Sequence, residues 1–122
     1  MSWKLSTDRQ IWMQLTEVLT QRVVSGQYPP GIRIPSVRDL AAEAGVNPNT
    51  MQRALAAMEE EGLLTSQRNT GRYVTQDTDQ IAATRNRLAE RELALFREKM
   101  KQLGYSGQEI TQLLMKGEPN NE

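Results

Sequence analysis

The segment 36–61 restricts the fold most, because it contains two helical stretches joined by a tight turn. Ser36 is placed to cap a short helix over 37–44, since serine is favoured at helix N-termini. Gly45 ends that helix, and Pro48 opens the next one, because proline is well tolerated in the first helical turn. This succession predicts a helix-turn-helix unit.

The second helix of this unit, expected over 48–61, separates an apolar face from a hydrogen-bonding face. The apolar face, at three- and four-residue spacing, consists of Met51, Ala54, Leu55 and Met58. Asn49 and Arg53 lie roughly opposite, with Thr50 and Gln52 on the flanks. Asparagine and glutamine can pair with adenine, and arginine with guanine or phosphate. The face therefore suits a helix that reads the major groove, although a solvated surface helix would carry the same residue types.

Two short strands are expected after this helix, at 63–66 and 72–75. The connection between them is polar and contains Gly71, with Arg68 before it and Arg72 after it. Such a hairpin is typical of the wing that accompanies many helix-turn-helix units.

A first helix is expected over 8–25, where apolar residues again recur at helical spacing. The predicted core of the N-terminal domain consists of Leu15, Val18, Leu19, Leu40, Leu55 and Met58. The sequence thus predicts a mainly α fold with a small β-hairpin, in which a winged helix-turn-helix occupies residues 1–76.

After residue 76 the composition shifts to a long charged helix, about 80–103, and a second helix that Ser106 and Glu109 can start as a capping box. An apolar stripe runs along both helices, formed by Ile81, Leu88, Leu93, Leu95, Phe96, Met100, Leu103, Ile110, Leu113 and Leu114. The stripe is too long for burial within one chain, so region 77–122 is predicted to form a homodimer interface. Packing back onto the N-terminal domain is the alternative.

The composition excludes most enzyme chemistry. The chain has 122 residues and neither cysteine nor histidine, which removes thiolate metal sites, cysteine nucleophiles and the commonest general base. The clustered carboxylates at 59–61 are consecutive on a helix, so they point in different directions and do not converge on one substrate atom. We therefore expect no enzyme activity, no cofactor and no metal site.

Two further properties of the sequence bear on where in the cell the protein is found. The N-terminus is polar, without the apolar core of a secretion signal, and no uncharged apolar stretch of about 18 residues occurs. We expect a cytoplasmic protein that does not interact with membranes.

The net charge is zero, which by itself argues against a nucleic-acid-binding surface. The distribution matters more, because several arginines fall between positions 33 and 72 while three glutamates are bunched at 59–61. These arginines are Arg33, Arg38, Arg53, Arg68 and Arg72. If the fold gathers them and turns the glutamates away, a neutral protein can present a positive face to DNA.

Four motifs follow one another along the chain, GIRIPSVRDLA at 31–41, GVNPNT at 45–50, EGLL at 61–64 and GRYV at 71–74. In series, they resemble the GntR-type winged-helix regulators, and within them the short YtrA-like subfamily, over roughly residues 8–76. The resemblance implies a bacterial transcription regulator, a compact dimeric repressor whose recognition helix enters the major groove of operator DNA. It also implies that Arg38 contacts DNA and that the wing tip near Gly71 enters the minor groove.

Two positions depart from the broad family. Pro48 and Gln52 stand where many members have DNA-contacting arginines, so those contacts are not carried over. The Asn-Pro-Asn-Thr version followed by Arg53 is similar to the YtrA-like pattern and favours Asn49, Thr50 and Arg53. The full set of candidate DNA-binding residues is Arg33, Ser36, Arg38, Asn47, Asn49, Thr50, Gln52, Arg53, Arg68, Gly71 and Arg72.

Two competing functions are weighed against DNA binding: an enzyme that uses the carboxylates at 59–61, which their divergent directions disfavour, and a winged-helix module that binds a protein groove instead of DNA. Binding to duplex DNA discriminates between this module and a DNA-binding protein. The two C-terminal helices are too small to enclose a ligand cavity of about 300 Å³ or more, so an effector would have to lie between two subunits. The sequence identifies neither the target genes nor the inducing signal.

Overall fold

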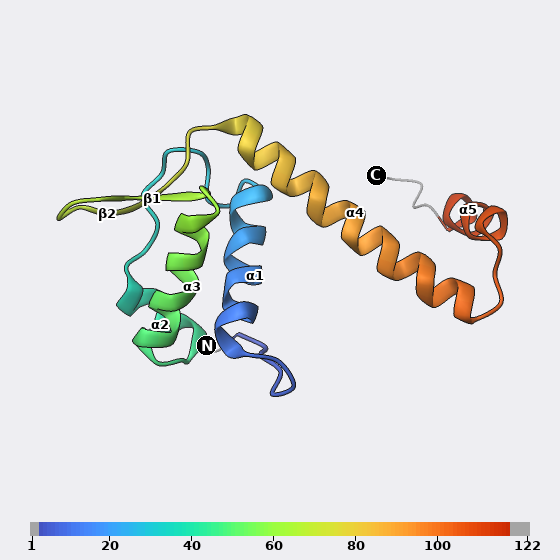
Figure 1. Ribbon diagram of the computed structural model, residues 1–122, viewed down its shortest axis with the longest axis horizontal. Coiled ribbons are helices and arrows are strands. Elements are labelled where there is room, and N and C mark those ends of the chain that lie inside the picture. Colours follow the sequence, from blue (N-terminus) through green and yellow to red (C-terminus); the bar gives the residue numbers. More distant parts are fainter. Residues whose placement is uncertain (1–2, 118–122) are drawn as a thin grey trace. The chain divides into compact units, whose positions relative to one another are not determined.

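The computed structural model describes residues 3–117, and the chain divides into two compact units, one ending at Arg85 and one beginning at Asn86. The described part is mainly helical with one antiparallel hairpin, which confirms the predicted fold class (Figure 1). The elements are α1 (Ile11–Val24), α2 (Val37–Ala44), α3 (Pro48–Glu60), β1 (Leu64–Gln67), β2 (Gly71–Val74), α4 (Thr78–Gln102) and α5 (Gly107–Lys116).

Helix α1 begins at Ile11, later than the expected start at residue 8. The side chain of Gln14 accounts for the difference. Its amide oxygen accepts the backbone N–H of Ser6 at 2.7 Å, and its amide nitrogen donates to the carbonyls of Ser6 and Arg9 at 2.8 and 3.0 Å. These bonds hold the preceding arm in a non-helical path, and they satisfy a polar side chain that is itself buried.

The helix-turn-helix forms where the local signals predicted it. The hydroxyl of Ser36 accepts the backbone N–H of Asp39 at 3.1 Å and caps α2, while Gly45 ends α2 with a φ of 77°. The side-chain oxygen of Asn47 then accepts the N–H of Asn49 at 2.7 Å and caps α3, which has proline in its first turn. Both helices therefore start at residues that satisfy otherwise unpaired N–H groups.

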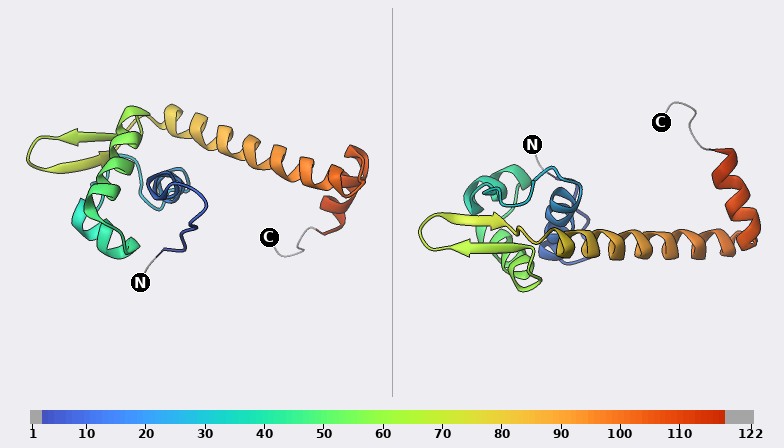
Figure 2. Two further views of the ribbon diagram at one scale, coloured as in Figure 1. Left: turned by 60° about the horizontal axis from the view of Figure 1, so that its bottom comes forward. Right: turned by 90° about the horizontal axis from the view of Figure 1, so that it is seen from above.

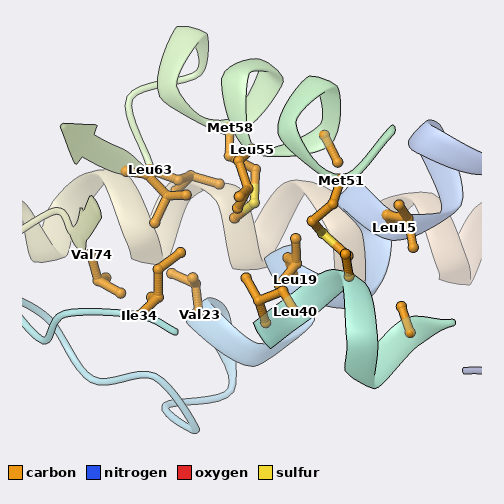
Figure 3. Close-up of a cluster of buried hydrophobic side chains, with 14 residues drawn as sticks. Leu15, Leu19, Val23, Ile34, Leu40, Met51, Leu55, Met58, Leu63 and Val74 are labelled. Carbon is orange, nitrogen blue, oxygen red and sulfur yellow. The ribbon is translucent and has the colours of Figure 1, made fainter. Parts of the chain in front are cut away.

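The core of the first unit lies among α1, α2 and α3, with α3 packed on both other helices (Figure 3). Its main side chains are Leu15, Leu19 and Val23 from α1, Leu40 from α2, and Met51, Leu55 and Met58 from α3. The apolar face predicted for the second helix of the unit is buried in full. Val18, expected in the core, is only half-buried, because the buried side of α1 is centred on Leu15 and Leu19.

Strands β1 and β2 form a hairpin that projects from the three helices (Figure 2). Leu64 pairs with Val74 at its base, and Gln67 pairs with Gly71 at the end where the turn begins. The backbone of Ile32 and Ile34 bonds the outer edge of β2, at 2.9 Å to the N–H of Val74 and 3.0 Å to the carbonyl of Arg72. This third segment fixes the wing to the helical core.

In the second unit, the predicted capping box starts α5. The N–H of Glu109 donates to the Ser106 hydroxyl at 3.1 Å, and the N–H of Ser106 donates to the Glu109 carboxylate at 2.9 Å. Within residues 3–117, no helix is long and apolar enough to cross a membrane.

Candidate nucleic-acid interface

Helix α3 presents the predicted polar face to solvent. Asn49, Gln52 and Arg53 are exposed and Thr50 is half-buried, whereas the opposite face of α3 is in the core. The apolar side chains on the opposite face of α3 pack in the core and hold the helix in place, so the polar groups project from a fixed backbone. Asn47, also predicted to contact DNA, uses its side-chain oxygen to cap α3, and its two amide N–H groups stay available to another partner.

Two further predicted residues precede this face in the sequence, Arg38 in α2 and Ser36 at the N-cap of α2. Arg38 is exposed, and it takes part in none of the ion pairs among residues 3–117. Ser36 is exposed too, and although its oxygen accepts the N–H of Asp39, its O–H stays available to donate to DNA. The cap and the predicted contact are compatible because a hydroxyl can accept one hydrogen bond and donate another at the same time.

Arg53 has a neighbour that sequence reasoning missed. Its guanidinium carbon lies 4.4 Å from the centre of the Trp12 ring, a cation–π contact between α3 and the first turn of α1. The sequence held only a weak signal for this contact, a tryptophan at the start of an amphipathic helix.

The wing arginine Arg72 departs from expectation. Its Nε lies 3.2 Å from Oε1 of Glu59, and its side chain is only 19% exposed. Ser66, the cross-strand partner of Arg72, donates its hydroxyl to the other carboxylate oxygen of Glu59. The condition set for a positive face, that the glutamates turn away from the arginines, is not met by Glu59, because the hairpin register places Ser66 and Arg72 side by side against the end of α3.

Arg33 and Gly71 meet at the wing. Gly71 has a φ of 118°, and a Cβ added there would lie 2.9 Å from Nε of Arg33. A side chain at this position would therefore be strained and would displace the guanidinium. Arg33 is exposed, and so is Arg68, which lies in the turn between the strands.

A second cluster, formed around Arg22 by Trp3, Tyr28 and Glu43, connects α2 to α1 and to the N-terminal arm. The guanidinium of Arg22 lies 4.8 Å from the Trp3 ring centre and 5.6 Å from that of Tyr28, and it also pairs with Glu43 on α2. The hydrogen bond from Arg22, with a weaker one from Trp3, holds the pKa of Glu43 below its ordinary value. The same pairing raises the pKa of Arg22. This cluster ties α2 to α1 and to the N-terminal arm.

Comparison with known proteins identifies the family. Residues 13–74 match the model of the family described as "Bacterial regulatory proteins, gntR family". The HTH-type transcriptional repressor YtrA of Bacillus subtilis is 30% identical over 107 residues, which cover 84% of this chain and 78% of YtrA. The uncharacterized HTH-type transcriptional regulator YhcF of the same bacterium is 29% identical over 107 residues, or 88% of each chain.

Solved structures agree with this match. A GntR family transcriptional regulator from Listeria monocytogenes has a TM-score of 0.86 at 32% identity, over 93% of this chain and 100% of that one. The DNA-binding domain of AraR, solved in complex with operator ORX1, has a TM-score of 0.53 at 25% identity, over 62% of this chain and 92% of that one. The chain therefore belongs to the gntR family of bacterial regulatory proteins, as a YtrA-like helix-turn-helix transcription regulator.

Proposed function

We propose that this protein represses transcription in the bacterial cytoplasm by binding a palindromic operator as a homodimer. The observation that carries the proposal is the exposed hydrogen-bonding face of α3, formed by Asn49, Gln52 and Arg53 on a helix whose other face is buried. The name of YtrA as a repressor and the operator complex of AraR support this assignment.

In this proposal α3 enters the major groove. Asn49 and Gln52 can each pair bidentately with an adenine, and Arg53 can do the same with a guanine. Thr50, half-buried at the start of the helix, can donate to a base or a phosphate. These contacts would supply the sequence preference.

Phosphate contacts fix the position of the protein on the duplex. The exposed arginines Arg33, Arg38 and Arg68 suit this role, because they stay outside the ion pairs of the described part of the chain. Arg72 is left out of this set, since Glu59 already neutralises it. Gly71 lets the wing approach the minor groove without a side chain in the way.

The homodimer is supported by apolar side chains that this chain leaves uncovered. Leu95, Leu103 and Leu114 are 55%, 72% and 54% exposed. The other exposed members of the predicted stripe are Leu93, Phe96 and Leu113. Exposed apolar residues in such number are typical of an interaction site, and a second copy supplies a matching apolar surface.

Four members of the predicted stripe behave differently. Leu88 and Met100 are half-buried, so a partner would cover only the remainder of each side chain. Ile110 is already buried without a partner. Ile81 packs against the core of the first unit, so we leave it and Ile110 out of the proposed interface.

Selection of bound duplexes from a random pool tests the proposal, using the full-length protein. We expect enrichment of an inverted repeat, because a symmetric dimer presents two identical recognition helices. Affinity for the selected duplex should fall steeply as salt is raised, since each arginine–phosphate contact releases counterions. A pool without enrichment, or an affinity independent of salt, would contradict DNA recognition and leave the protein-binding alternative.

A further inference from the structure

We propose that Trp12 is a positioning residue for DNA recognition, whose indole holds the guanidinium of Arg53 in the orientation that reads a base pair. The inference rests on the proposed function. It assigns to α1 a role in sequence preference, although α1 need not touch the DNA itself.

The ring is itself held in place. Trp12 lies in the first turn of α1 and is half-buried, and its indole N–H donates to the side chain of Gln10 at 2.6 Å. The hydroxyl of Thr16, one turn later, lies 3.0 Å from the carbonyl oxygen of Trp12 and 3.4 Å from that of Ala54. These contacts fix the start of α1 beside the turn of α3 that carries Arg53.

The arginine that the ring contacts keeps its donors. Arg53 is exposed and takes part in no ion pair or side-chain hydrogen bond within residues 3–117, so the indole is its recorded side-chain partner there. A guanidinium donates its N–H groups in its own plane, and a contact with an aromatic ring uses none of them. All five donors therefore stay free for a guanine edge or a phosphate.

Arg72, whose partner is a carboxylate, provides a comparison with Arg53, whose partner is an aromatic ring. The carboxylate of Glu59 takes a donor of Arg72 and neutralises its charge, whereas the indole leaves both the donors and the charge of Arg53 intact. A free arginine side chain loses much rotamer freedom when it forms a bidentate pair. The ring removes part of that freedom before DNA arrives, which favours one geometry of the pair.

A double-mutant cycle in the full-length chain tests the inference. The variants are Trp12→Leu, Trp12→Phe, Arg53→Met and the Leu/Met double variant. Each is titrated by fluorescence anisotropy against the selected duplex and its single-base-pair variants. Thermal unfolding confirms that each variant is folded before it is titrated.

We expect Trp12→Leu to weaken binding to the selected duplex about two- to fivefold, the size of an exposed cation–π contact. The loss should be concentrated at the base pair where Arg53→Met also relaxes discrimination. Trp12→Phe should recover part of the effect because it keeps a ring. In the Arg53→Met background, Trp12→Leu should cost nothing further.

Trp3 offers a matched control, because it makes a cation–π contact with Arg22 instead of Arg53. Trp3→Leu should leave the profile of base preference unchanged. Equal costs of Trp12→Leu with and without Arg53, or a loss spread evenly over all base pairs, would overturn the positioning role alone. A wild-type chain that binds every duplex alike would overturn the proposed function, and this inference with it.

Discussion

At the scale of single residues, each arginine of the predicted positive face has a different environment. Arg38 and Arg68 are exposed, Arg33 lies against Gly71, Arg53 contacts an indole, and Arg72 pairs with a carboxylate. The first four keep their charge uncompensated by a recorded ion pair in the described part of the chain. A local positive surface on a protein of zero net charge is therefore consistent with the structure.

The pair between Glu59 and Arg72 leads to the prediction at this scale. Glu59→Gln should release the charge of Arg72 at the wing and strengthen binding to non-cognate duplex DNA. One additional phosphate contact should steepen the salt dependence by about 0.9 in log–log slope. The measurement is a titration of a non-cognate duplex over a series of salt concentrations.

Glu60→Gln is the matched control. Glu60 is the next residue along α3, is exposed, and makes no contact with Arg72 among those the structure records. The two variants change net charge equally, so any difference between them reports the release of Arg72. Identical salt slopes would show that Arg72 contributes nothing to DNA binding even when freed.

At the scale of elements, the helix-turn-helix depends on contacts that hold α2 in place. Leu40 anchors α2 in the core, and Glu43 ties its far side to Arg22 on α1 and to Trp3 of the N-terminal arm. The pair is partly exposed, so its contribution to stability is modest and is screened by salt. Together with Leu40, the pair holds α2 against α1 and the N-terminal arm.

The lowered pKa of Glu43 predicts how this tie depends on pH. A carboxylate whose pKa is depressed by folding stabilises the protein above its ordinary pKa, 4.5 for glutamate, and loses that effect as pH falls through the lower folded-state value. Glu43→Gln should therefore lower the melting temperature at pH 7. The difference from the wild type should shrink as pH falls below about 4.

Glu17→Gln provides the comparison, because Glu17 pairs with Arg9 at a site that is more than half exposed on both sides. This variant should change the melting temperature little at either pH. A Glu43→Gln difference that persists at low pH would mean that the ionised pair is not its source.

At the scale of the whole molecule, we propose different roles for the two units, DNA binding for the first and dimerisation for the second. The first unit has its own core and carries the proposed DNA contacts, and it extends to Arg85 because Ile81 packs on its core. The side chain of Gln80 also donates to the carbonyl of Glu61 at 2.9 Å. The second unit leaves apolar side chains exposed, and for this reason we propose that it forms the homodimer interface.

Truncation after Arg85 tests this division. The fragment should fold, because the core and the Gln80 contact are retained, and it should sediment as a monomer. Its affinity for the full palindrome should fall by at least about 10²-fold, since the second half-site is no longer an intramolecular contact. Sedimentation and anisotropy titrations measure the two effects.

Leu95→Glu should reproduce both effects in the full-length chain, because an unpaired charge in an apolar interface is costly. Ala94→Glu adds the same charge at an exposed position outside the predicted stripe and should leave the dimer intact. A truncated fragment that remains dimeric would place the interface in the first unit and contradict the role proposed for α4 and α5.

The sequence by itself determined the features that depend on neighbours along the chain. The starts of α2, α3 and α5 were predictable because each cap joins residues two or three positions apart, as Ser36 and Asp39 show. The buried face of α3 followed from helical periodicity. The exposed face of α3 followed with it, and so did the candidate contacts Asn49 and Arg53.

Only the tertiary structure decided which distant side chains become partners. Trp12 reaches Arg53 because α1 packs against α3, and Glu59 reaches Arg72 because the hairpin register faces Arg72 towards the end of α3. Composition and periodicity do not predict either pair, because the two residues of each pair lie on different elements and are far apart in the sequence. The partner of a charged side chain depends on packing angles and strand register, and these are fixed by the whole core at once.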